Sequence, residues 1–228
     1  IYCYMASDIF KRPITKADAK ERALGKVAIL GLGYQMGATK FRDTCALWGI
    51  DILEDQPCED CGKSEREHFR SNHSYTPENP TLITAVRVVS AFRAKFSKLT
   101  HMWKDQEEDA IRAVVNAGAA SRGPVIKSGR IEWQYEDGFL YCRLPSGRRL
   151  AYPDPYVNQI VTPWGAKRKQ LSFMSIDPYT RQWKRQTTYG GMLVENITQA
   201  VARDLMAGAL VACAKSGVYA PVLSVHDE

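Results

Sequence analysis

The chain has 228 residues, of which 45% are apolar and 25% are charged, and its net charge is +6. This composition is ordinary for a globular protein and provides enough apolar side chains for a packed core. The positive charge suits a polyanionic partner such as nucleic acid, although a basic enzyme that binds no nucleic acid would share it.

Several protein classes are excluded by the same sequence. We find no apolar run near the roughly 20 residues that cross a bilayer, so we expect no membrane association. Residues 1–10 lack the regions of a signal peptide, and the absence of an initiator Met indicates a chain that starts within a longer protein. Six cysteines are too few for a disulfide scaffold, which favours a reduced, cytoplasmic setting.

The first half of the chain is predicted to be helical. A helix is expected over 17–32, with Thr15 or Asp18 as its N-cap. Residues 54–80 are polar and aperiodic, which predicts a loop or a small insertion. The longest helical pattern covers 81–117, and polar residues at 104–109 interrupt it, so two helices could form there.

The second half mixes strands with one helix. Residues 130–135 and 139–144 are predicted to be strands that form a hairpin through Glu136-Asp137-Gly138. The proline-containing segment 152–165 is predicted to be a loop. A helix is expected over 193–216, and a final strand over 218–225. The order of elements therefore predicts an α+β protein with a helical half followed by a mixed half.

A glycine-rich segment allows one competing function. Lys26 to Gly37 resembles a dinucleotide-binding turn, because an apolar run meets glycines and Asp51 lies 18 residues beyond Gly33. That fingerprint needs G-x-G-x-x-G after a strand, but here Gly31, Gly33 and Gly37 place the last glycine one residue late. An NAD(P)-dependent oxidoreductase that uses these glycines is the alternative function.

Interpreted as a helix, the same segment carries a different pattern. Arg22, Lys26, Leu30 and Tyr34 follow each other at intervals of four, so they share one stripe roughly 18 Å long. Two cations lie at one end and an aromatic ring at the other, which matches the phosphates and the base of a nucleoside triphosphate. On spacing alone, an amphipathic helix with a solvated basic edge is the simpler interpretation. The glycines in this helix indicate a close approach by another group, or a bend.

Five stretches, in order, resemble family A DNA polymerases of the bacteriophage type. Arg22-x3-Lys26-x7-Tyr34 resembles motif B, the nucleotide-binding helix of the fingers. Ile1–Phe10 is similar to the helix that enters the fingers, and Leu144–Tyr152 to the strand and turn "SGR-x-L" of the palm. Thr188–Asp204 is similar to the palm helix before motif C, and Val225–Glu228 to motif C itself. Each stretch is a weak signal alone, but their order covers nearly the whole chain.

The resemblance implies roles in nucleotide binding. Arg22 and Lys26 would hold the triphosphate, and Lys26 would also act in catalysis by protonating the departing pyrophosphate. Tyr34 would close the pocket beside the base pair. Leu30 stands where the family usually has Phe or Tyr, so the stacking contact with the sugar is in doubt.

The resemblance also implies contacts with DNA and metal. Gln199 would touch the minor groove of the primer-template, and His226 would lie near the primer end. Arg148 would contact the DNA backbone. Asp227 would bind the catalytic Mg²⁺ ions, with Glu228 as a further candidate ligand. Alone, each of these residues would be taken for a solvated polar side chain.

The fold implied by the resemblance is an incomplete polymerase right hand. Residues 1–15 would form the helix between palm and fingers, and 16–125 the helical fingers with a polar insertion at about 54–80. Residues 126–228 would form part of the palm, with a small antiparallel sheet, and would end at motif C. The implied function is transfer of a dNTP to a primer 3′-OH by a two-Mg²⁺ mechanism.

The family also uses an aspartate in motif A, upstream of the helix that Ile1–Phe10 resembles. We therefore expect that a second polypeptide or a missing segment supplies motif A, the thumb and any exonuclease. On this interpretation the chain alone does not extend a primer, since half of the metal ligands are absent. A non-catalytic, nucleic-acid-binding remnant is the remaining alternative.

The polar insertion carries a candidate zinc site. Cys58 and Cys61 form a Cys-x2-Cys pair, and His68 and His73 follow it. Two thiolates and two imidazoles can complete a tetrahedron around one structural Zn²⁺. The spacing is shorter than in common zinc fingers, and an exposed loop with reduced thiols is the alternative interpretation.

This zinc site can be tested directly. We expect the chain prepared with zinc available to contain about one equivalent of the metal, and Cys58→Ser to lose it because thiolates provide half of the ligands. Elemental analysis of the two proteins measures this. Wild-type protein without stoichiometric zinc would contradict the prediction.

Overall fold

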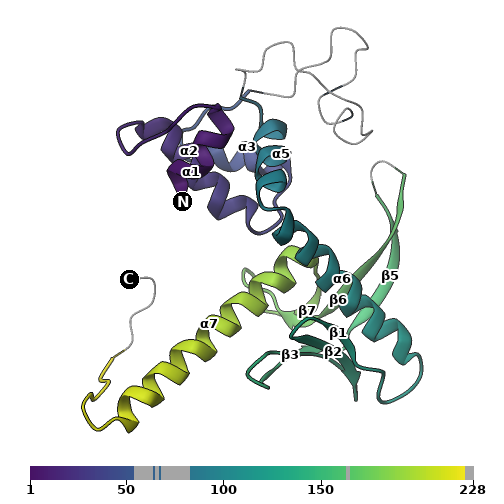
Figure 1. Cartoon of the computed structure of the whole chain (residues 1–228). Coiled ribbons are helices and arrows are strands. Elements are labelled where there is room, and N and C mark those ends of the chain that lie inside the picture. Colours follow the sequence, from purple (N-terminus) through teal and green to yellow (C-terminus); the bar gives the residue numbers. More distant parts are fainter. Residues whose placement is uncertain (54–63, 65–66, 68–82, 163–164, 224–228) are drawn as a thin grey trace. The chain divides into compact units, whose positions relative to one another are not determined.

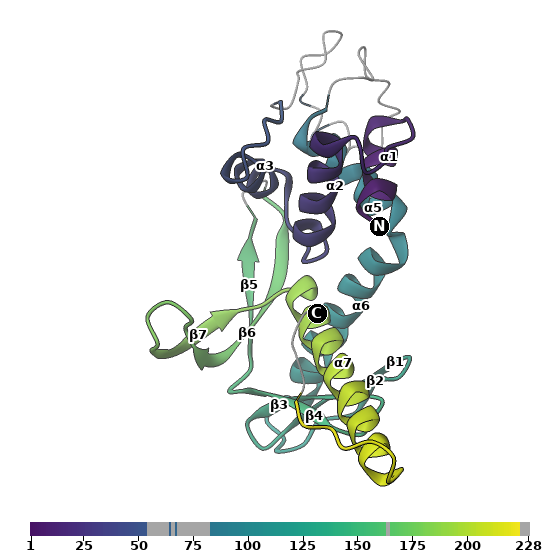
Figure 2. The same ribbon diagram turned by 90° about the vertical axis from the view of Figure 1, so that its left-hand side faces the viewer.

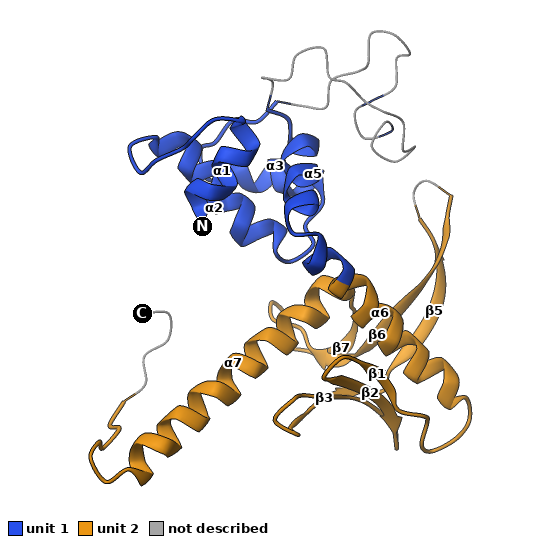
Figure 3. Ribbon diagram, viewed as in Figure 1, with its two compact units in different colours: residues 1–101 blue, residues 102–228 orange. Residues whose placement is uncertain are grey.

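The computed structural model describes residues 1–53, 64, 67, 83–162 and 165–223. Within these residues the protein is α+β, as the sequence predicts, with six helices and two small antiparallel sheets. The chain forms two compact units, residues 1–101 and 102–228 (Figure 3). The predicted boundary between fingers and palm, at residues 125 and 126, falls inside the second unit, directly before its first strand.

The first unit is helical. Its helices are α1 (Tyr2–Phe10), α2 (Ala19–Leu32), α3 (Ala38–Leu47) and α5 (Ala85–Lys95) (Figure 1). Met5, Leu32, Phe41 and Val88 are almost completely buried and come from all four helices. The predicted helix over 17–32 is therefore confirmed, and each neighbouring helix contributes to its packing.

Helix α6 (Ser97–Ala117) follows α5 in the chain, and only Phe96 separates the two helices. The two helices that the sequence allows within 81–117 are thus present, but the break lies at Phe96, and residues 104–109 are helical. Their buried polar groups have partners: the Gln106 side chain accepts a hydrogen bond of 2.9 Å from the indole of Trp133, so the polar stretch does not end the helix.

The second unit contains both sheets. The four-stranded sheet has the order β1 (Ile126–Ser128), β2 (Ile131–Glu136), β3 (Phe139–Arg143) and β4 (Arg149–Pro153), and the three-stranded sheet has the order β5 (Tyr156–Val161), β6 (Lys167–Ile176) and β7 (Trp183–Thr187) (Figure 2). The predicted hairpin is confirmed. Asp137 and Gly138 form its turn with φ of 47° and 82°.

Two predictions about this half were wrong. The segment 152–165 was expected to be a loop, but it contains β5, because Pro153 and Pro155 lie at strand ends where no ladder hydrogen bond is lost. The expected strand over 218–225 does not form in its described part, 218–223. Those residues are exposed and lack a neighbouring strand to pair with.

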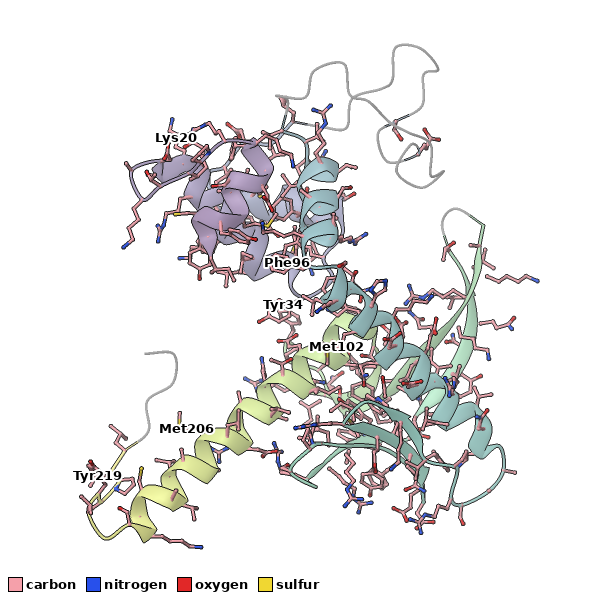
Figure 4. All side chains as sticks on the ribbon, viewed as in Figure 1. Lys20, Tyr34, Phe96, Met102, Met206 and Tyr219 are labelled. Carbon is pink, nitrogen blue, oxygen red and sulfur yellow. The ribbon has the colours of Figure 1, made fainter. Side chains whose placement is uncertain are left out.

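Helix α7 (Gly190–Lys215) packs its first turns into the second unit. Leu193, Ile197 and Ala200 join one core with Trp133 and Leu140 of the four-stranded sheet. Figure 4 labels Met206 and Tyr219, which lie farther along the chain beyond this packed portion.

Among the described helices, α7 is also long and apolar enough to cross a membrane, with a mean hydropathy of 1.3 over 18 residues. This finding corrects the expectation that no apolar run has such a length. One helix of this kind is weak evidence for a membrane protein, because core helices and signal sequences can have the same length and composition.

The start of α7 depends on close backbone packing against α6. A Cβ atom added to Gly190 would lie 2.0 Å from the carbonyl oxygen of Trp103, so only glycine fits. The Gly190 amide donates a hydrogen bond of 3.1 Å to the carboxylate of Glu107, which also pairs with Arg168 at 2.8 Å. A carboxylate at a helix N-terminus satisfies a free amide and complements the helix dipole.

We expect Gly190→Ala to destabilise the protein by about 1–3 kcal/mol, because the methyl group would force α7 away from α6. Gly208→Ala, in the same helix, is the control. Its Cβ would meet nothing within 4 Å, so alanine should stabilise the helix by up to about 1 kcal/mol. Urea denaturation of both variants measures the effect, and equal stabilities would contradict the packing argument.

Candidate nucleotide-binding and DNA-binding site

Helix α2 carries the residues that the sequence analysis assigned to a nucleoside triphosphate. Asp18 is its N-cap and Gly33 its C-cap, so Arg22, Lys26 and Leu30 lie within one helix at intervals of four. Tyr34 follows in the turn after the helix, where its amide donates to the Gly31 carbonyl at 3.3 Å. The structure therefore brings three of the four residues onto one helical stripe and places Tyr34 directly beyond it. Figure 4 labels Tyr34.

The two cations of the stripe face aromatic rings rather than acids. The Arg22 guanidinium lies 5.9 Å from the ring centroid of Tyr2, and the Lys26 ammonium lies 5.6 Å from that of Trp48. Both side chains are half-buried. In the part of the chain that the structure describes, neither forms an ion pair with a carboxylate. Their charges are thus available to an anionic ligand. Because both cations are partly shielded from water, their attraction to an anion is stronger than that of fully exposed cations.

The rotation of α2 is fixed by a glycine. A Cβ atom on Gly25 would lie 2.3 Å from the Tyr2 carbonyl oxygen, so α1 packs directly against the α2 backbone. The hypothesis that glycines in this helix mark a close approach is confirmed at Gly25. This contact also holds the Tyr2 ring beside Arg22.

The apolar end of the stripe is open. Leu30 is 45% exposed and Tyr34 is 44% exposed, so both side chains reach the surface of the first unit. A base or a sugar could cover both. Leu30 has no aromatic ring, so it cannot stack on a sugar as Phe or Tyr would at this position.

The dinucleotide-binding alternative was wrong. It requires a strand before Gly31 and a tight turn at the glycines. Residues 26–32 are instead the second half of α2, and Gly33 has helical dihedral angles, with φ of −55° and ψ of −26°. The apolar run that imitates a strand is the buried face of a helix, with Val27, Ala28 and Leu32 in the core.

Gln199 lies on the exposed side of α7, where its amide donates to the Glu195 carboxylate at 3.2 Å. Burial of Ile197 and Ala200 on the other side fixes the direction in which Gln199 points. An exposed amide on a rigid helix can reach a polar partner such as a groove edge.

Arg148 makes contacts within the chain that sequence reasoning missed. Its Nε donates to the Asp204 carboxylate at 2.6 Å, and its Nη2 donates to the Ala200 carbonyl at 2.8 Å. The Ser146 hydroxyl donates to the second oxygen of Asp204 at 2.5 Å. The Ser-Gly-Arg turn is thereby clamped onto α7, and the hydroxyl and the guanidinium lower the pKa of Asp204.

A second link joins the same two segments. The Asn196 amide donates to the Tyr152 hydroxyl at 3.2 Å, and burial raises the pKa of Tyr152. The stretches Leu144–Tyr152 and Thr188–Asp204 therefore interlock. No local sequence pattern reports this, since the pairs are 44 to 58 residues apart.

The remaining predicted residues lie outside the described part of the chain. These are the motif C residues His226, Asp227 and Glu228 and the candidate zinc ligands Cys58, Cys61, His68 and His73. Among the residues that are described, no group of three or more His, Cys, Asp or Glu side chains is arranged to hold a metal ion.

Comparison with known proteins gives one informative match. The whole chain is 36% identical, over 231 aligned positions, to a DNA polymerase of Bacillus phage SP02. The chain spans 30% of the length of that polymerase. No protein-family model matches the chain, and no solved structure is significantly similar to it. The resemblance to a phage DNA polymerase is thus confirmed, while membership of family A stays a prediction.

The Asp204 clamp makes stability depend on pH. Because the folded carboxylate has a lowered pKa, its contribution is present above the ordinary pKa near 3.8 and is lost as the pH falls through the lower folded value. We expect Asp204→Asn to reduce the free energy of unfolding at neutral pH, and the difference from wild type to shrink below about pH 4.

Urea titrations of both proteins between neutral and acidic pH measure this dependence. Glu108→Gln is the control, since Glu108 forms only an exposed pair with Lys104 at 3.8 Å and should have little effect. A difference between Asp204→Asn and wild type that stays constant down to the lowest pH would refute the clamp.

Proposed function

We propose, from its full-length similarity to part of a phage DNA polymerase, that this chain forms the fingers and part of the palm of a family A, template-directed DNA polymerase. The observation that carries the proposal is the stripe of Arg22 and Lys26 on α2, two cations without carboxylate partners among the described residues. In this proposal the protein acts inside a bacterial host cell on primer-template DNA and dNTPs.

The stripe would bind the incoming nucleotide along its length. Arg22 would grip phosphate oxygens with its planar fork, and Lys26 would supply a point charge where the pyrophosphate leaves. If the helical rise is continued to Tyr34, which lies directly beyond α2, Arg22 and Tyr34 are roughly 18 Å apart, which fits a triphosphate, a sugar and a base in that order. Tyr34 would then lie beside the new base pair, and Leu30 would make a weaker contact with the sugar than an aromatic ring.

The second unit would hold the DNA. Gln199 is exposed on a helix whose other side is buried, so it can contact the minor groove of the primer-template. Arg148 is engaged by Asp204, and we propose that it contributes mainly by fixing the Ser-Gly-Arg turn near the duplex. Asp204 and Arg148 would thus position the groove-binding face of α7.

The metal chemistry would come from two Mg²⁺ ions, which activate the primer 3′-OH and neutralise the phosphates when bound. The carboxylates of Asp227 and Glu228 have the hard oxygen ligands that Mg²⁺ prefers. The phage relative has most of its length outside the matched region. We propose that motif A, the thumb and any exonuclease lie there, and that the 228 residues alone do not extend a primer.

The proposal predicts that, in the assembled polymerase, Lys26→Ala impairs incorporation more than Gln199→Ala. A fixed cation acts where charge develops in the transition state, so its loss should lower the rate by about 10² to 10³. Losing one neutral hydrogen bond at a groove edge should cost about 1 kcal/mol, which is less than tenfold in rate. Single-turnover incorporation of one dNTP measures both rates.

Lys20→Ala provides a matched control. Lys20 is an exposed lysine on α2, six residues before Lys26 and about 120° away around the helix. This variant should incorporate normally if only the stripe binds the nucleotide. An unimpaired Lys26→Ala enzyme would refute the assignment of the nucleotide-binding stripe. A wild-type assembly that incorporates no dNTP would instead favour a non-catalytic nucleic-acid-binding protein.

A further inference from the structure

The four-stranded sheet has one buried face and one open face. Side chains alternate along β2 and β3, so Trp133, Leu140 and Cys142 enter the core while their neighbours point the other way. Helices α6 and α7 contribute to the core on the buried side (Figure 2). The opposite side carries no helix in the described part of the second unit, and it is hollowed by a cavity of about 350 Å³.

The open face has an excess of positive charge. It carries two acids, Glu132 and Glu136, and four cations, each paired with one of these acids. The cations are Arg122, Lys127, Arg143 and Arg149. Each glutamate therefore holds two cations, and the face keeps a net charge of +2. All four basic side chains are at least half exposed, so their remaining donors reach solvent.

Flat groups lie among these charges. Tyr141 stacks on Phe139, with ring centroids 5.7 Å apart and planes 24° apart. The Arg149 guanidinium lies 4.1 Å from the centre of the Tyr141 ring. Phe139 and Tyr141 alternate with buried residues on β3, so an aromatic row runs along the middle of the open face, with Arg143 at its end.

We infer that this open face binds single-stranded nucleic acid, namely the unpaired template strand beyond the primer-template duplex. Aromatic rings on a positively charged surface stack exposed bases while arginines hold the phosphates. A duplex would offer its phosphates but not its base planes, since these are already stacked. The inference rests on the proposed polymerase function and names the surface that holds one part of its substrate.

The test uses the assembled polymerase and two primer-templates that differ only in the length of the 5′ template overhang. We expect Tyr141→Ala to weaken binding of the long-overhang DNA by roughly 5- to 150-fold, the usual loss for one stacked base. Binding of the short-overhang DNA should stay unchanged. Arg143→Ala should reduce the slope of log Kd against log salt by about 0.7 on the long overhang only.

Matched controls lie in the other sheet of the same unit. Arg185 lies 5.7 Å from the ring centroid of Tyr156 and pairs with Asp154, which reproduces the chemistry of Arg149 and Tyr141 outside the open face. Arg185→Ala and Tyr156→Ala should bind both DNAs like wild type. Tyr141→Phe should restore binding because it keeps the ring.

The outcomes separate this inference from the function it rests on. If Tyr141→Ala and Arg143→Ala bind the long-overhang DNA like the control variants, or lose affinity for both DNAs equally, the template-strand assignment is overturned. If the wild-type assembly binds neither primer-template, the proposed polymerase function itself fails. Arg143 is exposed, so its variant tests the face even if Tyr141→Ala does not fold.

Discussion

The close contact between the Gly25 position of α2 and the Tyr2 carbonyl of α1 is the constraint on which the nucleotide-binding proposal depends. A helix without a side chain at that point can be approached by another backbone, and this fixes how α2 is rotated about its axis. Arg22 and Lys26 then lie against the rings of Tyr2 and Trp48 rather than against acids. Their charge is left for a phosphate-bearing ligand because the packing beside them uses no carboxylate.

In the second unit, too, a glycine allows close packing against the backbone of a neighbouring helix. Gly190 brings the start of α7 onto the α6 backbone, and Ser146 and Arg148 clamp the helix again at Asp204. These contacts hold α7 at two points about four turns apart. Gln199 lies between these two contacts. The direction of its side chain therefore depends on how α7 is held at Gly190 and Asp204, and not on the residues next to it in the sequence.

The sequence predicted those elements whose signals are local. The N-cap candidate Asp18 located the start of α2, and Asp137-Gly138 located the hairpin, because both signals depend on neighbouring residues. The strands β6 and β7 were missed since they are rich in Lys, Arg and Gln, and tertiary pairing overrides that composition. The roles of Arg148 and of the open face of the four-stranded sheet were equally hidden. They depend on pairs far apart in the chain and on register, which periodicity does not encode.

The most direct test of the central claim is to locate the bound nucleotide. The assembled polymerase would be irradiated with a photoreactive dNTP on a primer-template, and the labelled peptide would be sequenced. A reactive group on the base should label the end of α2 at Tyr34, and one on the γ-phosphate should label the end at Arg22 and Lys26. Both labels should require the complementary template base. Labelling elsewhere, or labelling that ignores the template base, would contradict the account.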